Sequence, residues 1–400
     1  MTFPKPSRKF SRWSRLAMRI GSIKWKLRSH GARSAISETT SCKRDVTSQS
    51  PAMQAFSSSP AHTVSYEGRT MWNTLPLLVC LANACLANAV AAQSLQVVET
   101  ENVITVERGG KIVVTYNKVS PPAPSGIDKV YERSGCLHPV ATPLGRTVTE
   151  MFPFDHPHQH GIFSAWVRTT YDGQTVDFWN LAGGTGRVLH ERVVSTFQKG
   201  DVAGFEVDLI HRAETKPPVD VLRERWKITV QPTDETYHCF DLETTQAAIT
   251  GKPLTVSKHH YGGIVLRGPT RWLTAKDNDA RKYLDLVREP SEFVNDLGSD
   301  RLKGNHQHAK WVALSGRING KPVCIAVLSH AENPRAPQAT RLHPTKPYFC
   351  FAPCIDGTFL IDRDHPFKAR YRYLVKDAEP DSQWINQQWE TWVGERDTAR

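Results

Sequence analysis

The sequence predicts an all-β fold, a large antiparallel β-sandwich or barrel with one short carboxyl-terminal helix. After residue 93 the chain consists mostly of short segments that alternate apolar and polar residues or are rich in β-branched residues, which is typical of strands. Gly, Pro, Asn and Asp separate these segments at close spacing, as in sandwiches and barrels. No glycine-rich phosphate loop leads from a strand into a helix.

The elements follow in chain order. The first hairpin has β-rich arms at 103–107 and 111–116 around Gly109-Gly110, because a diglycine favours a tight reversal. Asn319-Gly320 joins a later pair of strands in the same way. One helix is expected from Asp381 to Val393, since Pro380-Asp381 is a typical helix start. Further strands are expected at 162–169, 175–179, 187–196, 203–211, 222–230, 236–246, 262–267, 309–316, 322–329, 347–352, 357–361 and 369–375.

The net charge of +11 is concentrated at the amino terminus. Residues 1–70 contain 13 Lys and Arg against 3 Asp and Glu, a surplus of 10 that leaves +1 for residues 71–400. This extension lacks apolar periodicity, and we expect it to be disordered. We also expect the true start at Met71 or Met53, so that the extension is wholly or partly an over-extended reading frame. A nearly neutral globular part predicts no nucleic-acid partner.

Residues 71–92 resemble a secretory signal peptide. An apolar run interrupted by Asn83 is followed by small residues at the −3 and −1 positions before Ala92 or Gln93. The run is too short to span a bilayer comfortably, so no stable membrane insertion is expected after cleavage. The pattern favours export, with a membrane anchor or a cytoplasmic apolar helix as alternatives. Residues 93–400 are then long enough for a single β-sandwich domain.

Five of the eight cysteines lie after residue 93. Because five is odd, at least one is free or pairs between chains. Cys350 and Cys354 flank Phe-Ala-Pro, which fits either a small disulfide loop or two buried thiols.

The segment from Asp155 to Gly161 is the strongest signal for chemistry. Its histidines stand two residues apart, at His156, His158 and His160. In an extended backbone all three would project to one face, and Pro157 disfavours a helix here. A polar cluster between two apolar segments is costly unless its groups are hydrogen-bonded, liganded or open to a cleft.

Three interpretations of this segment remain open. In the first, two or three of His156, His158 and His160, together with a carboxylate or another histidine, hold a divalent Zn, Fe or Cu ion. In the second, a histidine transfers protons to or from a polar substrate such as a sugar while Asp155 tunes it. In the third, Asp155 caps a tight turn by accepting backbone N–H bonds, and the histidines lie in a buried network.

Other polar clusters are expected to converge on this segment. His259 and His260 precede a diglycine, and they complete the predicted catalytic group with Asp155, His156 and His158. Tryptophans supply flat apolar faces, and arginines supply contacts to anions or hydroxyls. The predicted substrate-binding residues are His138, Trp166, Trp179, Arg267 and Arg341.

Several motifs resemble a known family. They include Tyr131-Glu-Arg-Ser-Gly-Cys-Leu-His138-Pro139, the segment 155–161 and His259-His-Tyr-Gly-Gly263. Together they resemble the "methane oxygenase PmoA"-like family, in effect a family of unknown function, over about residues 97–376. Where that family commonly has two adjacent histidines, this chain has His158-Gln159.

The resemblance implies a galactose-mutarotase-like supersandwich. The family's name implies methane oxidation, which is typical of a copper-dependent assembly with several membrane spans. No apolar segment after residue 93 is long enough to span a membrane, so the residues do not support that activity. By fold analogy we expect an exported protein that binds or acts on a carbohydrate or related polar small molecule by His/Asp acid–base chemistry. The alternatives are a metal-dependent oxygenase or hydrolase that uses the histidine triplet, and a non-catalytic carbohydrate-binding module.

Overall fold

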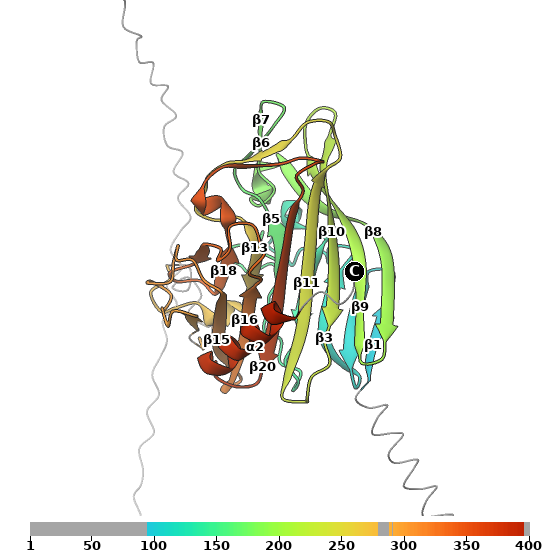
Figure 1. The fold of residues 1–400 in the computed structure, drawn as a ribbon. Helices are drawn as coiled ribbons and strands as arrows, with labels where there is room; N and C mark the ends of the chain where they lie inside the picture. The colour runs from blue at the N-terminus through green and yellow to red at the C-terminus, as the bar shows by residue number, and fades with distance from the viewer. Residues whose placement is uncertain (1–93, 279–287, 290, 396–400) are drawn as a thin grey trace, which may run out of the picture. The chain divides into compact units, whose positions relative to one another are not determined.

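The computed structural model describes residues 94–278, 288–289 and 291–395. The predicted extension 1–70 and the predicted signal peptide 71–92 lie outside the described residues. The described strands form two eight-stranded sheets and one four-stranded sheet, and their neighbouring strands pair antiparallel (Figure 1). The expected all-β antiparallel sandwich is confirmed.

The first sheet brings together strands from both ends of the domain. Its order is β1 (Leu95–Glu99), β2 (Val103–Arg108), β3 (Lys111–Asn117), β4 (Cys136–Val140), β5 (Ile162–Ala165), β13 (Gly263–Arg267), β18 (Tyr348–Phe351) and β17 (Thr340–Leu342).

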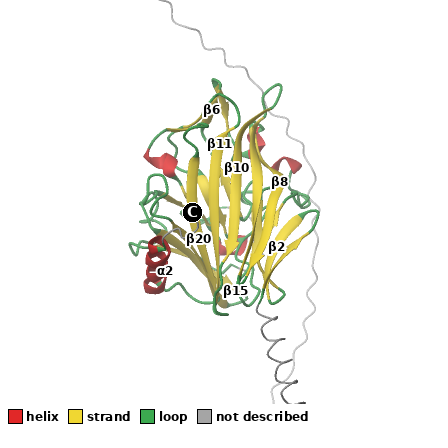
Figure 2. Cartoon of the chain, turned by 45° about the vertical axis from the view of Figure 1, so that its right-hand side comes forward, coloured by secondary structure: helices red, strands yellow, loops and turns green. Residues whose placement is uncertain are grey.

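The second sheet contains the longest strands, which run side by side in Figures 1 and 2. Its order is β14 (Glu292–Asn295), β15 (Trp311–Ile318), β16 (Lys321–Ser329), β20 (Phe367–Lys376), β11 (Tyr237–Ala248), β10 (Val219–Val230), β9 (Val202–Ala213) and β8 (Gly186–Lys199). The small third sheet has the order β19 (Phe359–Ile361), β12 (Leu254–Val256), β6 (Thr169–Tyr171) and β7 (Gln174–Val176). Short 3-10 turns lie between strands at η1 (Lys129–Tyr131), η2 (Leu181–Gly183), η3 (Thr270–Trp272) and η5 (Pro353–Asp356).

The turn chemistry agrees with the predicted hairpins. Gly109 and Gly110 have φ of 55° and 73°, and Asn319 and Gly320 have φ of 54° and 72°. These left-handed conformations are those of a two-residue hairpin turn, which explains why Gly and Asn occupy the positions. The sequence prediction missed β1, β4, β12, β14 and β17, and its strand at 162–169 ends at Ala165 and contains only the first residue of β6.

A polar network crosses the core between the two large sheets. Glu224 of β10 is fully buried, and its Oε1 accepts hydrogen bonds from Trp226 Nε1 at 2.7 Å and Thr244 Oγ1 at 2.7 Å. Gln246 Nε2 donates to the same oxygen at 3.0 Å, and His211 Nε2 lies 2.6 Å from Oε2. A buried carboxylate is tolerated only when it is bonded in this way.

The carboxyl-terminal helix α2 (Ser382–Gly394) covers the outer side of the second sheet (Figure 2). Asp381 caps it by accepting from the amides of Gln383 and Trp384, as the Pro-Asp start predicts. Its Ile385 and Trp392 pack with buried residues of β15, β16 and β20. No helix among the described residues is long and apolar enough to cross a membrane.

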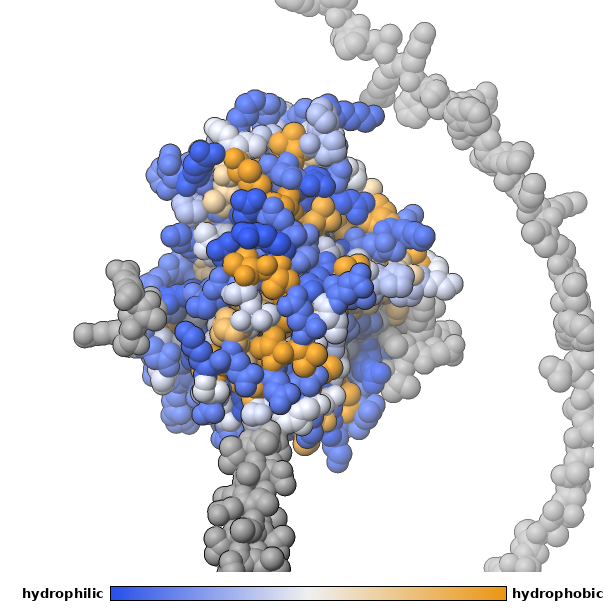
Figure 3. Space-filling view, turned by 90° about the vertical axis from the view of Figure 1, so that its right-hand side faces the viewer, coloured by the Kyte–Doolittle hydropathy of each residue, from blue (hydrophilic) through white to orange (hydrophobic). Residues whose placement is uncertain are grey.

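On the side where the edge strands β1 and β8 lie, apolar residues form a broken band among hydrophilic ones (Figure 3). Such a band is expected where the apolar core between two sheets reaches an open edge. The cysteines of the described part, Cys136, Cys239, Cys324, Cys350 and Cys354, are buried free thiols, so the disulfide alternative for Cys350 and Cys354 is wrong.

The two faces of the first sheet differ in character. Phe349 and Phe351 of β18 contact aromatic rings of the second sheet, so they mark the inner face. Alternation then places Tyr348 on the outer face, together with its cross-strand partner Arg267. Arg341 of β17, the partner of Cys350, projects to the same side. This outer face of the first sheet carries the candidate site.

Candidate functional site

The segment 155–161 is not extended, which corrects the prediction that its histidines share one face. The amide of His156 donates to Pro153 O at 3.0 Å, and the amide of Gln159 donates to His156 O at 2.9 Å. These are two consecutive turns, and Pro157 occupies the second position of the later one, where its fixed φ is favoured. Pro157 disfavours a helix, as predicted, but it stabilises a turn rather than an extended strand.

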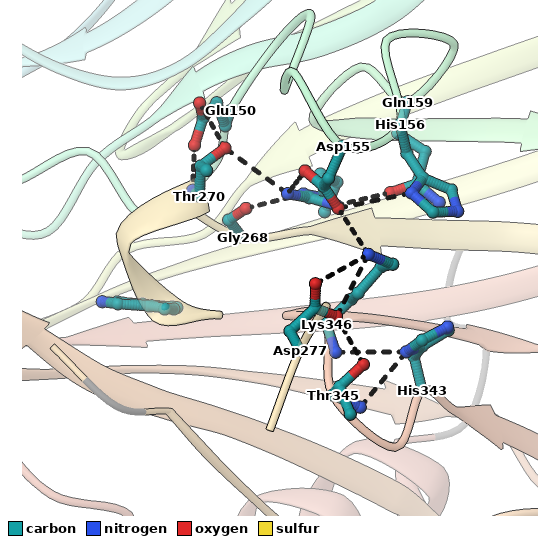
Figure 4. A network of polar contacts seen from close by, with 12 residues as sticks. Glu150, Asp155, His156, Gln159, Gly268, Thr270, Asp277, His343, Thr345 and Lys346 are labelled. Carbon is teal, nitrogen blue, oxygen red and sulfur yellow. Dashed lines mark hydrogen bonds and ion pairs between the residues drawn. The ribbon is translucent and has the colours of Figure 1, made fainter. Parts of the chain in front are cut away.

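Asp155 is held in a buried network of charges (Figure 4). Its side chain and that of Arg267 are both 0% exposed, and the guanidinium donates to both carboxylate oxygens at 2.7 and 2.9 Å. Lys346 Nζ lies 3.4 Å from Asp155 and 3.1 Å from Asp277, so it bridges the two carboxylates. Burial alone would raise the pKa of Asp155, but the Arg267 guanidinium and His156 hold it well below its usual range.

His156 connects this network to a cluster of rings. Its Nδ1 lies 3.3 Å from Asp155 Oδ2, an ion-pair distance without hydrogen-bond alignment. Its ring lies 5.3 Å from that of His158, 6.3 Å from that of His343 and 6.1 Å from that of Tyr348. The His156 side chain is 27% exposed, so solvent and ligands reach it.

The proton on His343 is assigned by its surroundings. Its Nδ1 accepts hydrogen bonds from the amides of Thr345 and Lys346 at 3.2 and 3.1 Å (Figure 4). Nδ1 must have a free lone pair to accept from these amides, so it carries no proton. The proton of the neutral ring is therefore on Nε2. Burial, followed by the charges of Arg341 and Lys346, lowers the pKa of His343 to about 3. His343 therefore offers an N–H donor at neutral pH.

His158 is also neutral at physiological pH. Burial lowers its pKa to about 3, and the neighbouring His156 acts in the same direction. Its ring lies 6.5 Å from that of Tyr131, which comes from the turn η1. The site thus contains two uncharged imidazoles beside His156.

A row of aromatic rings leads from Tyr348 to the predicted later histidines. The Trp179 ring lies 6.4 Å from Tyr348 and 4.9 Å from Tyr261. Tyr261 in turn lies 4.6 Å from His259 and 4.7 Å from His260. His156 and the pair at 259–260 therefore occupy two ends of one continuous row.

The Arg341 side chain lies beside this row, near Tyr348 and His260. Its Nη1 donates to Asn305 Oδ1 at 3.0 Å. Together with burial, its charge lowers the pKa of His260 and His306, whose rings lie 6.5 Å apart. The row ends at these two exposed imidazoles.

Other predicted residues lie in the scaffold. Trp166 is 0% exposed, and its Nε1 donates to the core residue Gln246 at 2.7 Å, so it presents no face to a ligand. Trp179 is 1% exposed, so its ring presents no face to a ligand either. Arg267 is fully buried in its ion pair. His138 Nδ1 is hydrogen-bonded to Thr149 Oγ1 at 2.9 Å. These positions suit support of the site rather than contact with a substrate.

The metal hypothesis requires two or three of His156, His158 and His160 to converge with a carboxylate or another histidine. His160 is instead fully buried, and its ring packs 4.4 Å from that of Phe152. Among residues 94–278, 288–289 and 291–395, no three His, Cys, Asp or Glu side chains are arranged to hold a metal ion. These described residues therefore contain no preformed arrangement of the kind that the metal hypothesis requires.

A cavity of about 680 Å³ lies away from these residues. Its lining includes Leu95, Arg108, Asp201 and His238, and none of the predicted site residues. The His238 imidazole faces the carbonyl of Ala141 at 3.0 Å. Because that lining brings together no group of neighbouring imidazoles, the row of rings is the better candidate for chemistry.

Buried neutral histidines predict a loss of stability in acid. Burial lowers the pKa of His138 to about 4 and those of His158 and His343 to about 3, whereas an unfolded histidine titrates near 6.5. Below pH ~6.5 the unfolded chain binds protons that the folded chain does not. Each histidine then removes about 1.4 kcal/mol of unfolding free energy per pH unit until its folded pKa is reached.

Urea unfolding at pH 7.5 and pH 5.5 measures this loss. The free energy of unfolding should be lower at pH 5.5 than at pH 7.5. The change His343→Gln should make this difference smaller by the contribution of one histidine. The control His365→Gln, at a side chain that is 84% exposed, should leave the difference unchanged. Equal differences in all three proteins would contradict the assignment.

Sequence reasoning did not include His343 among the site residues. The signal was available, since Arg341 and His343 are two residues apart and share a face when extended. Tyr348 and Lys346 were missed. They enter the site because β18 pairs with β13 and β17, and no short pattern predicts those pairings.

A family of unknown function, DUF6807, matches residues 103–390. None of the curated proteins matches the chain. Similar solved structures include the Slr1438 protein from Synechocystis sp. PCC 6803, a putative kojibiose phosphorylase from the human microbiome and the alpha-galactosidase from Lactobacillus brevis.

These three structures resemble the chain only distantly. Their identities are 10%, 9% and 8%, and their TM-scores are 0.35, 0.29 and 0.32. The matches cover 71%, 77% and 71% of this chain, and 96%, 34% and 39% of theirs. At this level the three carry no argument about this chain. The family match covers most of the sequence and gives no support to the methane-oxygenase name. By that match, the chain belongs to the family of unknown function DUF6807.

Proposed function

We propose that the protein is an exported enzyme that binds a carbohydrate or a related polar small molecule on the outer face of the first sheet and acts on it by acid–base chemistry. The observation that carries the proposal is the placement of His156, which is partly exposed, in contact with the locked Asp155, and next to His158 and His343. A histidine oriented by a buried carboxylate is a common arrangement for proton transfer. Export rests on the pattern of residues 71–92.

Each group has a distinct role in this proposal. Asp155 is a positioning residue, because Arg267 and Lys346 neutralise it and it favours a proton on His156 Nδ1. His156 Nε2 is then left to take a proton from a substrate hydroxyl. The Nε2–H of His343 donates a hydrogen bond to a substrate oxygen.

The character of the surroundings favours a sugar-like ligand. Neutral imidazoles pair with hydroxyl groups, which can both donate and accept. The ring of the partly exposed Tyr261 offers an apolar face for the C–H groups of a pyranose. Small-molecule sites typically combine such faces with a few placed polar groups.

Calorimetric titration of the purified protein with a saccharide panel tests the proposal. At least one saccharide should bind with a dissociation constant in about the micromolar to millimolar range. The change His343→Ala should weaken that binding about tenfold, because one hydrogen bond is lost, whereas His365→Ala should not. Failure of every saccharide to bind the folded protein would contradict the proposal.

A further inference from the structure

Three arginines around the site have no carboxylate partner among the described residues. Arg133 is buried and donates only to the carbonyl of Phe178, at 2.8 Å, while its Nε and Nη1 lack partners. Arg301 is buried and donates through Nη1 to the carbonyls of His343 and Lys346, at 2.9 and 2.8 Å. These bonds fix the turn that follows β17 but do not neutralise the guanidinium.

Arg341 is the third, and it is partly exposed. Its Nη1 bonds to the neutral amide of Asn305, and its Nε is enclosed without a partner. Its ionisable neighbours include the Tyr348 hydroxyl, to which it is hydrogen-bonded, and the imidazoles of His260, His306 and His343. A partly desolvated cation among uncharged groups is costly unless an anion joins it.

Within the part of the chain that the structure describes, the carboxylates near the site are already engaged. Asp155 pairs with Arg267 and Lys346, and Asp277 pairs with Lys346. Asp177 accepts from the amides of Trp179 and Asn180 at 2.8 and 2.9 Å. The positive charge of Arg341 is therefore left for a ligand.

We propose that the ligand is an anionic saccharide, whose carboxylate or sulfate group binds Arg341 while its hydroxyl groups meet the histidines. This inference rests on the proposed function and names its substrate class. A guanidinium forms short, charge-assisted hydrogen bonds with either anion. The exposed imidazoles of His260 and His306 lie beside the same position and can donate to the anion's remaining oxygens.

Matched pairs of sugars test the inference by calorimetry. The pairs are galacturonate with galactose, glucuronate with glucose, and galactose 6-sulfate with galactose. In at least one pair the anionic member should bind about tenfold or more tightly, with an advantage that shrinks as salt is added. Arg341→Gln should abolish the advantage. The matched control Arg317→Gln changes an arginine that is 51% exposed and should preserve it.

The outcomes separate this inference from the proposed function. Equal binding of neutral and anionic sugars, unchanged in Arg341→Gln, overturns the inference and leaves the proposed function standing. Binding of acetate or sulfate ions as tightly as any sugar acid upholds an anion site and contradicts the sugar-binding function. Binding of nothing contradicts both. If Arg341→Gln fails to fold, two other measurements decide whether the anion binds through the charge of Arg341. They are the affinity of Arg341→Lys and the salt dependence of the unaltered protein, and neither requires the charge to be removed.

Discussion

The change Asp155→Asn should lower the free energy of unfolding by about 3–5 kcal/mol. The amide has the size of the carboxylate but no charge, so Arg267 is left buried without a counter-ion. Lys346 also loses Asp155 as a carboxylate partner. Urea denaturation at neutral pH measures the loss, and circular dichroism shows whether the sheet survives.

Asp220 provides a matched control. It accepts two hydrogen bonds from Arg212, at 2.6 and 3.1 Å, but both side chains are 39% exposed. Asp220→Asn should therefore cost less than about 1 kcal/mol, because water replaces the lost partner. If the two variants lose the same stability, the Asp155 pair is not the anchor of the turns at 153–159.

The change His156→Gln should reduce turnover of a bound substrate by about 10²- to 10⁴-fold. Glutamine keeps a polar side chain of similar reach but does not transfer protons near neutral pH. The dissociation constant should stay within a few-fold of the original, since His343 and the aromatic rings remain. The measurement is initial rate against substrate concentration, with calorimetry on the same samples.

Two comparisons make the result decisive. His308→Gln, at a side chain that is 52% exposed and pairs with Asp356, should leave turnover unchanged. An unaltered rate in His156→Gln would remove this histidine from the chemistry. A saccharide that binds the unaltered protein but is never converted would identify a carbohydrate-binding module rather than an enzyme.

The fold was largely predictable because its long strands have a regular pattern. β10 alternates buried and less buried residues along much of its length, as expected of a strand packed on one face. The strands that were missed include β12 and β17, which have three residues each. Three residues are too few for an alternating pattern to stand out.

The site was predictable in its residue types but not in its geometry. The histidines at 156 and 158 were singled out, yet their backbone forms turns because Asp155 meets Arg267, a residue 112 positions later. Trp166 was assigned to the ligand and belongs to the core, since its partner Gln246 lies 80 positions away. Such long-range pairs decide which polar residues face solvent, and no local pattern contains them.

The central claim is that a saccharide binds beside His156 and His343. A crystal structure of the protein soaked with the tightest-binding saccharide tests it most directly. The account predicts the sugar on the outer face of the first sheet, with an oxygen within hydrogen-bond distance of His343 Nε2. A sugar found instead in the cavity lined by Arg108 and His238, with the row of rings unoccupied, would contradict the account.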